Sequence, residues 1–288
     1  MIYEIKSENL TAKIDSLGAE LKSVTLGGKE YMWSGDEKYW DDIAPILFPV
    51  CGQLLNKEYS YGGKKYGMNG HGFAKISEFV PTLVEKDRLT LSLSATEKTK
   101  EIYPFDFEFI ADFTVKGDTL GLKLTVKNTG DGVLPYMVGW HPGFVLHGEG
   151  AINNFTLEFG GADKVIWHPL QNGCFVNPNG KDYALVNGKY QLDEDEIYSN
   201  DTMVFCGTRE RAYLSSPDTD AAVEIRYSEN LPYFCIWKET DAKARFICLE
   251  PWSDVPSTGE VPEVFETRKM SRLSSGACEE YSYSVKFI

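Results

Sequence analysis

The amino-acid sequence predicts an all-β protein, built as a large antiparallel β-sandwich. In several segments apolar and polar residues alternate with a period of two, as they do on strands that bury one face. The stretches between these segments carry the Asn-Gly and Gly-Gly pairs of tight hairpin turns. No long segment shows the three- and four-residue apolar spacing of an amphipathic helix. Many short strands with frequent turn signals are typical of a sandwich.

The strands can be placed along the chain from this pattern. In residues 107–115, for example, Phe107, Phe109, Ala111 and Phe113 alternate with residues that include two acidic side chains. A run that is apolar throughout predicts a strand buried on both faces, and residues 246–249 form such a run. The predicted strands are 89–95, 107–115, 120–126, 134–138, 223–227, 246–249 and 281–287. The predicted turns are 27–29, 62–64, 116–118, 128–132, 179–181 and 187–189, with short helical turns at 36–41 and 262–269.

Composition and charge narrow the class of partner. The chain has 288 residues, and 43 acidic against 29 basic side chains give a net charge of −14. Such an excess repels phosphate backbones and anionic lipids, so nucleic acid and membrane surfaces are not expected partners, whereas a small neutral ligand is compatible. No apolar run approaches the roughly 20 residues that span a bilayer, and the N-terminus lacks the pattern of a secretory signal. We therefore expect a cytoplasmic protein, with residues 1–288 forming a single domain.

The cysteines predict neither a metal centre nor a disulfide framework. Six are scattered along the chain, and no two have Cys-x-x-Cys spacing. In a chain without an export signal, scattered thiols are expected to stay reduced.

Two of the four histidines lie in unusual contexts. His71 is flanked by Gly70 and Gly72, which allow a sharp turn and the close approach of a ligand. His141 follows the predicted strand 134–138 and precedes Pro142 and Gly143, which end a strand. Each is a candidate for an acid–base role, and the alternative is a hydrogen-bonded structural histidine at a turn. His147 and His168 are interpreted as structural loop residues.

Glu250 is the third candidate. It follows the apolar run 246–249 and precedes Pro251 and Trp252, so its carboxyl is expected to be buried. Burial raises a carboxyl pKa and makes the carboxylate a better base near neutral pH. The alternative is a structural ion pair with a lysine or arginine. The sequence lacks Gly-x-Ser-x-Gly, His-Glu-x-x-His and the phosphate-binding loop. The residues alone therefore indicate a β-sandwich with an acid–base site.

Ordered motifs through nearly the whole chain make the sequence resemble the aldose 1-epimerase (galactose mutarotase-like) family, and most closely its branch of LacX-type proteins. Each motif is short, but their order along the chain is specific. The motifs are residues 17–21 (LGAEL), 30–33 (EYMW), 44–52 (APILFPVCG), 71–73 (HGF), 128–130 (NTG), 139–144 (GWHPGF), 236–237 (IW) and 248–252 (CLEPW).

The resemblance implies a galactose mutarotase-like β-supersandwich that interconverts the α and β anomers of a free aldose without a cofactor or metal. It implies that Glu250 is the general base at the C1 hydroxyl and that His141 is the general acid at the ring oxygen. His71 would hold the C1 or ring oxygen, and Asp201 would bind sugar hydroxyls. Aromatic rings such as Trp140, Phe144 and Trp237 would pack on the sugar or in the core.

Two positions depart from the family pattern. Gln53 stands where members usually carry arginine, and Lys75 stands where related members often do. Both are counted as substrate-binding candidates. Glutamine lacks the charge and the bidentate fork of arginine, and lysine keeps only the charge. A neutral aldose is therefore preferred over a sugar phosphate, although a hexose-6-phosphate 1-epimerase remains an alternative. A non-catalytic carbohydrate-binding or sensing protein on the same fold is a second alternative.

Overall fold

The structure is a computed structural model that describes residues 1–171, 174–241 and 243–288. It is dominated by three antiparallel sheets, with three two-stranded ribbons beside them. Among the described residues, no helix has the length and apolarity needed to cross a membrane.

The nine-stranded sheet runs in the order β20-β15-β22-β23-β27-β11-β10-β9-β8. Its long central strands show the predicted alternation, and Phe107, Phe109, Ala111 and Phe113 of β10 are all buried. The strands are β8 (Val80–Val84), β9 (Arg88–Ser94), β10 (Phe107–Lys116), β11 (Thr119–Asn128), β15 (Thr156–Phe159), β20 (Lys189–Gln191), β22 (Arg211–Ser215), β23 (Val223–Tyr227) and β27 (Cys278–Phe287).

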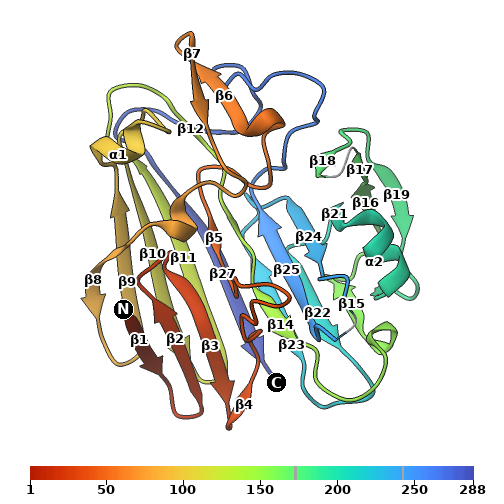
Figure 1. The fold of residues 1–288 in the computed structure, drawn as a ribbon. Helices are drawn as coiled ribbons and strands as arrows, with labels where there is room; N and C mark the ends of the chain where they lie inside the picture. The colour runs from red at the N-terminus through yellow and green to blue at the C-terminus, as the bar shows by residue number, and fades with distance from the viewer. Residues whose placement is uncertain (172–173, 242) are drawn as a thin grey trace.

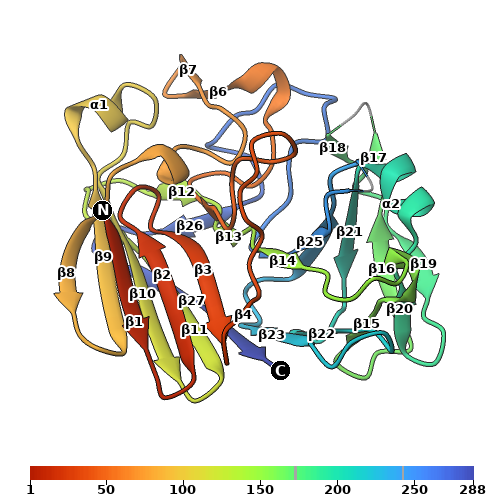
Figure 2. The same ribbon diagram turned by 60° about the horizontal axis from the view of Figure 1, so that its bottom comes forward.

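Two smaller sheets lie on this long one. In the four-stranded sheet β1-β2-β3-β4, strands β1 and β2 lie against β9 and β10 (Figure 2). Its strands are β1 (Ile2–Lys6), β2 (Leu10–Asp15), β3 (Glu20–Leu26) and β4 (Lys29–Glu30).

The eight-stranded sheet covers the other half and runs in the order β19-β16-β21-β24-β25-β13-β5, with β14 also paired to β25 (Figure 1). Its inner face packs on the nine-stranded sheet through aromatic contacts such as Phe159 with Phe234 and Tyr227 with Phe234. Its strands are β5 (Ile46–Leu47), β13 (Gly139–Trp140), β14 (Gly143–Val145), β16 (Lys164–His168), β19 (Lys181–Ala184), β21 (Thr202–Cys206), β24 (Tyr233–Trp237) and β25 (Phe246–Trp252).

The remaining elements are short. The ribbons pair β6 (Glu58–Tyr61) with β7 (Lys64–Gly67), β12 (Leu134–Tyr136) with β26 (Ser271–Leu273), and β17 (Leu170–Gln171) with β18 (Phe175–Val176). The helices are α1 (Glu97–Lys100) and α2 (Glu194–Asn200), with 3₁₀ turns η1 (Leu55–Lys57), η2 (Ala74–Ile76) and η3 (Ile152–Asn154).

The all-β prediction is confirmed, and the differences are local. Residues 36–41 and 262–269 contain single hydrogen-bonded turns, such as Trp40 N–H to Asp36 O at 3.0 Å, and no helix. The helix α2 was not predicted, because seven residues are too few to show a helical period. Its signal is Asp193, whose carboxylate accepts the first backbone N–H groups, followed by an acidic first turn. His168 ends strand β16 and is not a loop residue.

Candidate functional site

A cavity of about 280 Å³ opens on the outer face of the eight-stranded sheet. Residues far apart in the sequence meet there, and they include His71, His141 and Glu250. The lining residues are Trp40, Gly52, Gln53, Gly70, His71, His141, Leu170, Cys174, Asp201, Thr202, Val204, Trp237, Glu250, Trp252 and Pro256.

Glu250 lies at the bottom of this cavity on β25, a strand whose seven residues are all buried. Successive side chains on a strand point to opposite faces, so Leu249 and Pro251 face the core while Glu250 and Trp252 face the cavity. The Glu250 side chain is only 1% exposed. Neither of its oxygens has a hydrogen-bond partner among the described residues. Burial therefore raises the pKa of Glu250 well above the usual carboxyl value.

His141 is held above Glu250 by the short loop between β13 and β14, two strands that both pair with β25. Its backbone N–H donates to Pro45 O at 3.0 Å. Its Nε2 atom lies 3.2 Å from Oε2 of Glu250, in contact but not aligned as a hydrogen bond. Burial lowers the pKa of His141 well below the usual histidine value, and the neighbouring His71 lowers it further. Burial of the pair therefore favours a protonated carboxyl beside a neutral imidazole.

His71 stands perpendicular to His141, with the two ring centroids 5.5 Å apart. It makes reciprocal hydrogen bonds with Gly52: its backbone N–H donates to Gly52 O at 2.8 Å, and the Gly52 N–H donates to its Nδ1 at 3.2 Å. Because Nδ1 is an acceptor, the ring proton lies on Nε2. Burial, aided by the positive charge of Lys75, lowers the pKa of His71 to about 4. His71 is therefore a neutral hydrogen-bond donor at neutral pH.

Gly72 fixes the backbone that presents His71. Its φ is +76°, and a Cβ added there would lie 2.1 Å from the carbonyl oxygen of Phe48. We expect Gly72→Ala to lower the free energy of unfolding by about 2–4 kcal/mol, because both the backbone conformation and the close approach exclude a methyl group. Denaturant unfolding measures this loss. Gly132→Ala is the matched control, since nothing lies within 4 Å of its added Cβ. A loss for Gly72→Ala no larger than for this control would contradict the expectation.

Of the three predicted substrate-binding residues, Gln53 and Asp201 line the cavity and Lys75 does not. Gln53 lines the cavity wall beside Gly70. Asp201 lies at the rim, just after α2, and partial burial together with Glu239 raises its carboxyl pKa. Lys75 does not line the cavity, and its ammonium group forms an ion pair with Asp42.

Aromatic rings form much of the cavity wall. Trp40 lies against His141 with ring centroids 5.1 Å apart, and Trp237 lies 5.8 Å from His141 on another side. Sequence reasoning singled out Trp237 but missed Trp40 and Trp252. Trp252 lies two residues after Glu250 on the same strand, so strand periodicity was the available signal. Trp140 and Phe144 are core residues, only 1% and 0% exposed.

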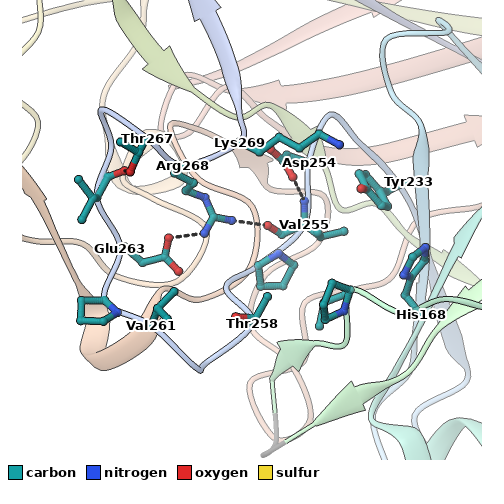
Figure 3. A pocket seen from close by; sticks show the side chains of 15 residues that line it. His168, Tyr233, Asp254, Val255, Thr258, Val261, Glu263, Thr267, Arg268 and Lys269 are labelled. Atoms are coloured by element: carbon teal, nitrogen blue, oxygen red, sulfur yellow. Dashed lines mark hydrogen bonds and ion pairs between the residues drawn. The ribbon is translucent and has the colours of Figure 1, made fainter.

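A second cavity of about 470 Å³ lies beside the first, and Pro256 lines both (Figure 3). Three of its charged groups, Arg268, Glu263 and Asp254, are paired with protein groups, and Lys269 is exposed. Arg268 forms an ion pair with Glu263 and donates to Val255 O at 2.7 Å, and the carboxylate of Asp254 accepts from the Val255 N–H. Burial raises the pKa of Asp254 to about 6. His168 lies here, while His147 packs edge-on against Tyr31 elsewhere. The smaller cavity, with its unpaired carboxyl, is therefore the better candidate site.

The fold and the cavity together define an all-β protein with a candidate acid–base site for a small ligand. The family model described as aldose 1-epimerase matches residues 1–258, and the chain belongs to this family. The plasmid protein LacX of Lactococcus lactis subsp. lactis is 28% identical over 281 residues, which covers 93% of each chain.

Solved structures support the fold. A galactose mutarotase related enzyme from Lactobacillus acidophilus matches with a TM-score of 0.94 at 25% identity, over 100% of this chain and 97% of that one. A galactose mutarotase-like protein from Lactobacillus casei ATCC 334 matches with a TM-score of 0.92 at 24% identity, over 100% of both chains.

Proposed function

We propose that this protein is an aldose 1-epimerase that interconverts the α and β anomers of a free hexose, with Glu250 as base and His141 as acid. The single observation that carries the proposal is the contact between a buried carboxyl and a buried imidazole, 3.2 Å apart, at the bottom of an open cavity. Anomer exchange needs one proton removed and one proton added at neighbouring oxygens, and two such groups supply both.

The proton balance follows from the pair. The Glu250 carboxylate removes the C1 hydroxyl proton, the C1 carbonyl forms, the bond from C1 to the ring oxygen breaks, and the ring oxygen takes a proton from the His141 imidazolium. Rotation about the C1–C2 bond presents the other carbonyl face, and the ring closes by the reverse steps. The Nε2–H of His71 donates to the C1 or ring oxygen and holds the sugar in register.

The ionisation of the pair fits this sequence of steps. One proton is shared between Glu250 and His141, and moving it from carboxyl to imidazole leaves their total charge unchanged. Burial favours the neutral forms, through the raised pKa of Glu250 and the lowered pKa of His141. Ring opening returns the pair to these neutral forms, so the protein environment favours the open-chain intermediate.

The cavity suits a neutral sugar better than a sugar phosphate. None of the described residues that line it is a lysine or an arginine, and the ammonium of Lys75 is paired with Asp42. A phosphate dianion would lack the cationic partners that usually hold it. Hydroxyl groups can instead bond with Gln53 and Asp201, while the tryptophan faces cover the C–H surface. The volume of about 280 Å³ is slightly below the roughly 300–1,000 Å³ typical of sites for drug-sized ligands, as expected for a monosaccharide.

Polarimetry of freshly dissolved α-glucose and α-galactose tests the proposal. We expect the protein to accelerate the approach to anomeric equilibrium, with a kcat/KM that changes little between low and high salt. A preference for glucose 6-phosphate that weakens steeply with salt would favour a sugar-phosphate epimerase. Sugar binding by calorimetry without acceleration, across a panel of aldoses, would contradict the proposal and favour a sensing protein.

A further inference from the structure

We propose that a thiophilic divalent cation, with zinc as the expected ion, binds reversibly at His141, Cys248 and Glu250 and thereby excludes the sugar. The inhibitory role rests on the proposed epimerase function, whereas the ion site itself does not. The ion is not required for turnover. The sequence predicts no such site, because the three residues have no metal-ligand spacing along the chain.

The pairing of strands in the sheet brings the three ligand atoms close together. One nitrogen of His141, Sγ of Cys248 and one oxygen of Glu250 all lie within 4.8 Å of one another, and all three residues are buried. Cys248 and Glu250 are two residues apart on β25, so their side chains share a face. His141 is held over that face because Gly143 pairs with Cys248 and Gly139 pairs with Trp252. Paired strands thus position His141, Cys248 and Glu250, which we call the triad.

The donor set suits zinc. Imidazole nitrogen, thiolate sulfur and carboxylate oxygen are its usual ligands, at about 2.0–2.3 Å. Three protein ligands with a fourth position open to water is the arrangement of an accessible zinc site. Two of the three ligands here, His141 and Glu250, line the cavity. A thiolate and a carboxylate together neutralise the dication, so the occupied triad buries no net charge. Binding releases the thiol proton of Cys248 and the carboxyl proton of Glu250 to solvent.

A second observation points independently to a ligand. The Glu250 side chain is 1% exposed and lines the cavity, and neither of its oxygens has a hydrogen-bond partner among the described residues. Buried polar groups are partnered in the great majority of cases, so unpartnered ones aimed into a cavity mark a place for a bound group. Sugar hydroxyls meet this need during turnover, and in their absence the cation does. The two therefore compete.

Direct binding tests the ion site without reference to activity. The reduced full-length chain is titrated with Co²⁺, followed by its thiolate charge-transfer absorption, and with Zn²⁺ by calorimetry. We expect one tight ion per chain, and we expect Cys248→Ala to remove the absorption and weaken binding more than about 100-fold, because even outer-shell changes cost 10–100-fold. Cys235→Ala is the matched control. Cys235 is also fully buried and faces Glu250 across β24 and β25, but it lies outside the triad.

Several outcomes would overturn the proposal. They are Co²⁺ binding without a thiolate band, absence of a tight ion, or an equal loss in Cys235→Ala. Because Cys248 is buried, thermal unfolding checks each variant, and Cys248→Ser provides a second substitution of nearly conserved size. If it folds while Cys248→Ala does not, its loss of the thiolate band supports the proposal and retention of that band contradicts it.

Inhibition kinetics with Zn²⁺ separate the proposed ion site from the proposed epimerase function. Zn²⁺ is expected to raise the apparent KM for the sugar in the wild type at least tenfold, and to have little effect on Cys248→Ala. Activity without ion binding refutes this inference alone. Ion binding by a protein that accelerates no aldose refutes the proposed function alone.

Discussion

Glu250→Gln is expected to slow anomer exchange by about 10²–10⁴-fold, the usual contribution of a positioned general base. Glutamine keeps the size of the side chain but cannot take the C1 hydroxyl proton. Polarimetry, or exchange spectroscopy of the two anomers, measures the change as a loss in kcat. A variant that retains wild-type turnover would show that Glu250 is not the base.

The same substitution is expected to stabilise the fold above acid pH. The pKa of Glu250 is raised in the folded state, so the native protein holds a proton that the unfolded chain releases. The stability that this bound proton contributes is therefore fully present below the carboxyl pKa of the unfolded chain, about 4.3. It is lost as pH rises through the raised pKa of Glu250 in the folded protein. Glutamine does not titrate, so we expect Glu250→Gln to be more stable than the wild type at neutral and alkaline pH, with this advantage lost at acid pH.

Glu263→Gln is the matched control for this stability effect. Glu263 is also buried, but its carboxylate is paired with Arg268. Removing its charge leaves a mostly buried guanidinium without a carboxylate partner, so this variant is expected to lose about 3 kcal/mol. Opposite signs for two buried glutamates, measured by denaturant unfolding across pH, would separate an unpaired carboxyl from a structural one. A destabilised Glu250→Gln would contradict this assignment.

Local pattern predicted seven of the strands, because burial on a sheet has a short period that a sequence displays directly. Other strands, such as β2, β3 and β21, were not predicted. Residues 107–115 alternate in the sequence and in burial alike. The helix α2 spans only Glu194–Asn200, which is too short to show a helical period. The segments 36–41 and 262–269, which were predicted as short helical turns, form turns and no helix. Short elements are set by capping and tertiary contacts, which periodicity does not report.

The site could be predicted only in part from the sequence, because its geometry depends on long-range strand pairing. His71, His141 and Glu250 could be proposed from their glycine, proline and apolar neighbours and from the family resemblance. Their convergence depends on pairings such as Gly143 with Cys248, which no local pattern contains. The same pairing brings Cys248 beside Glu250, and Trp40 reaches the cavity from a loop. Lys75 illustrates the converse, because its partner Asp42 comes from a distant segment.

His141→Ala is expected to slow turnover by about 10²–10⁴-fold, through loss of the acid that protonates the ring oxygen. His147→Ala is the control, since His147 follows the same strand region but packs against Tyr31 and does not line the cavity. Its turnover is expected to stay close to that of the wild type. Equal effects of the two substitutions would mean that the wrong imidazole has been assigned to the reaction.

The double variant Glu250→Gln with His141→Ala gives the sharper test of the pair. In the proposed mechanism Glu250 and His141, whose facing atoms lie 3.2 Å apart, exchange one proton. Either single substitution therefore removes the exchange on which both steps depend. Groups that act as a unit have strongly non-additive effects. The double variant is therefore expected to be no slower than about threefold below the slower single variant. Losses that multiply would show that the two groups act independently. That outcome would contradict the proposed exchange of one proton between Glu250 and His141.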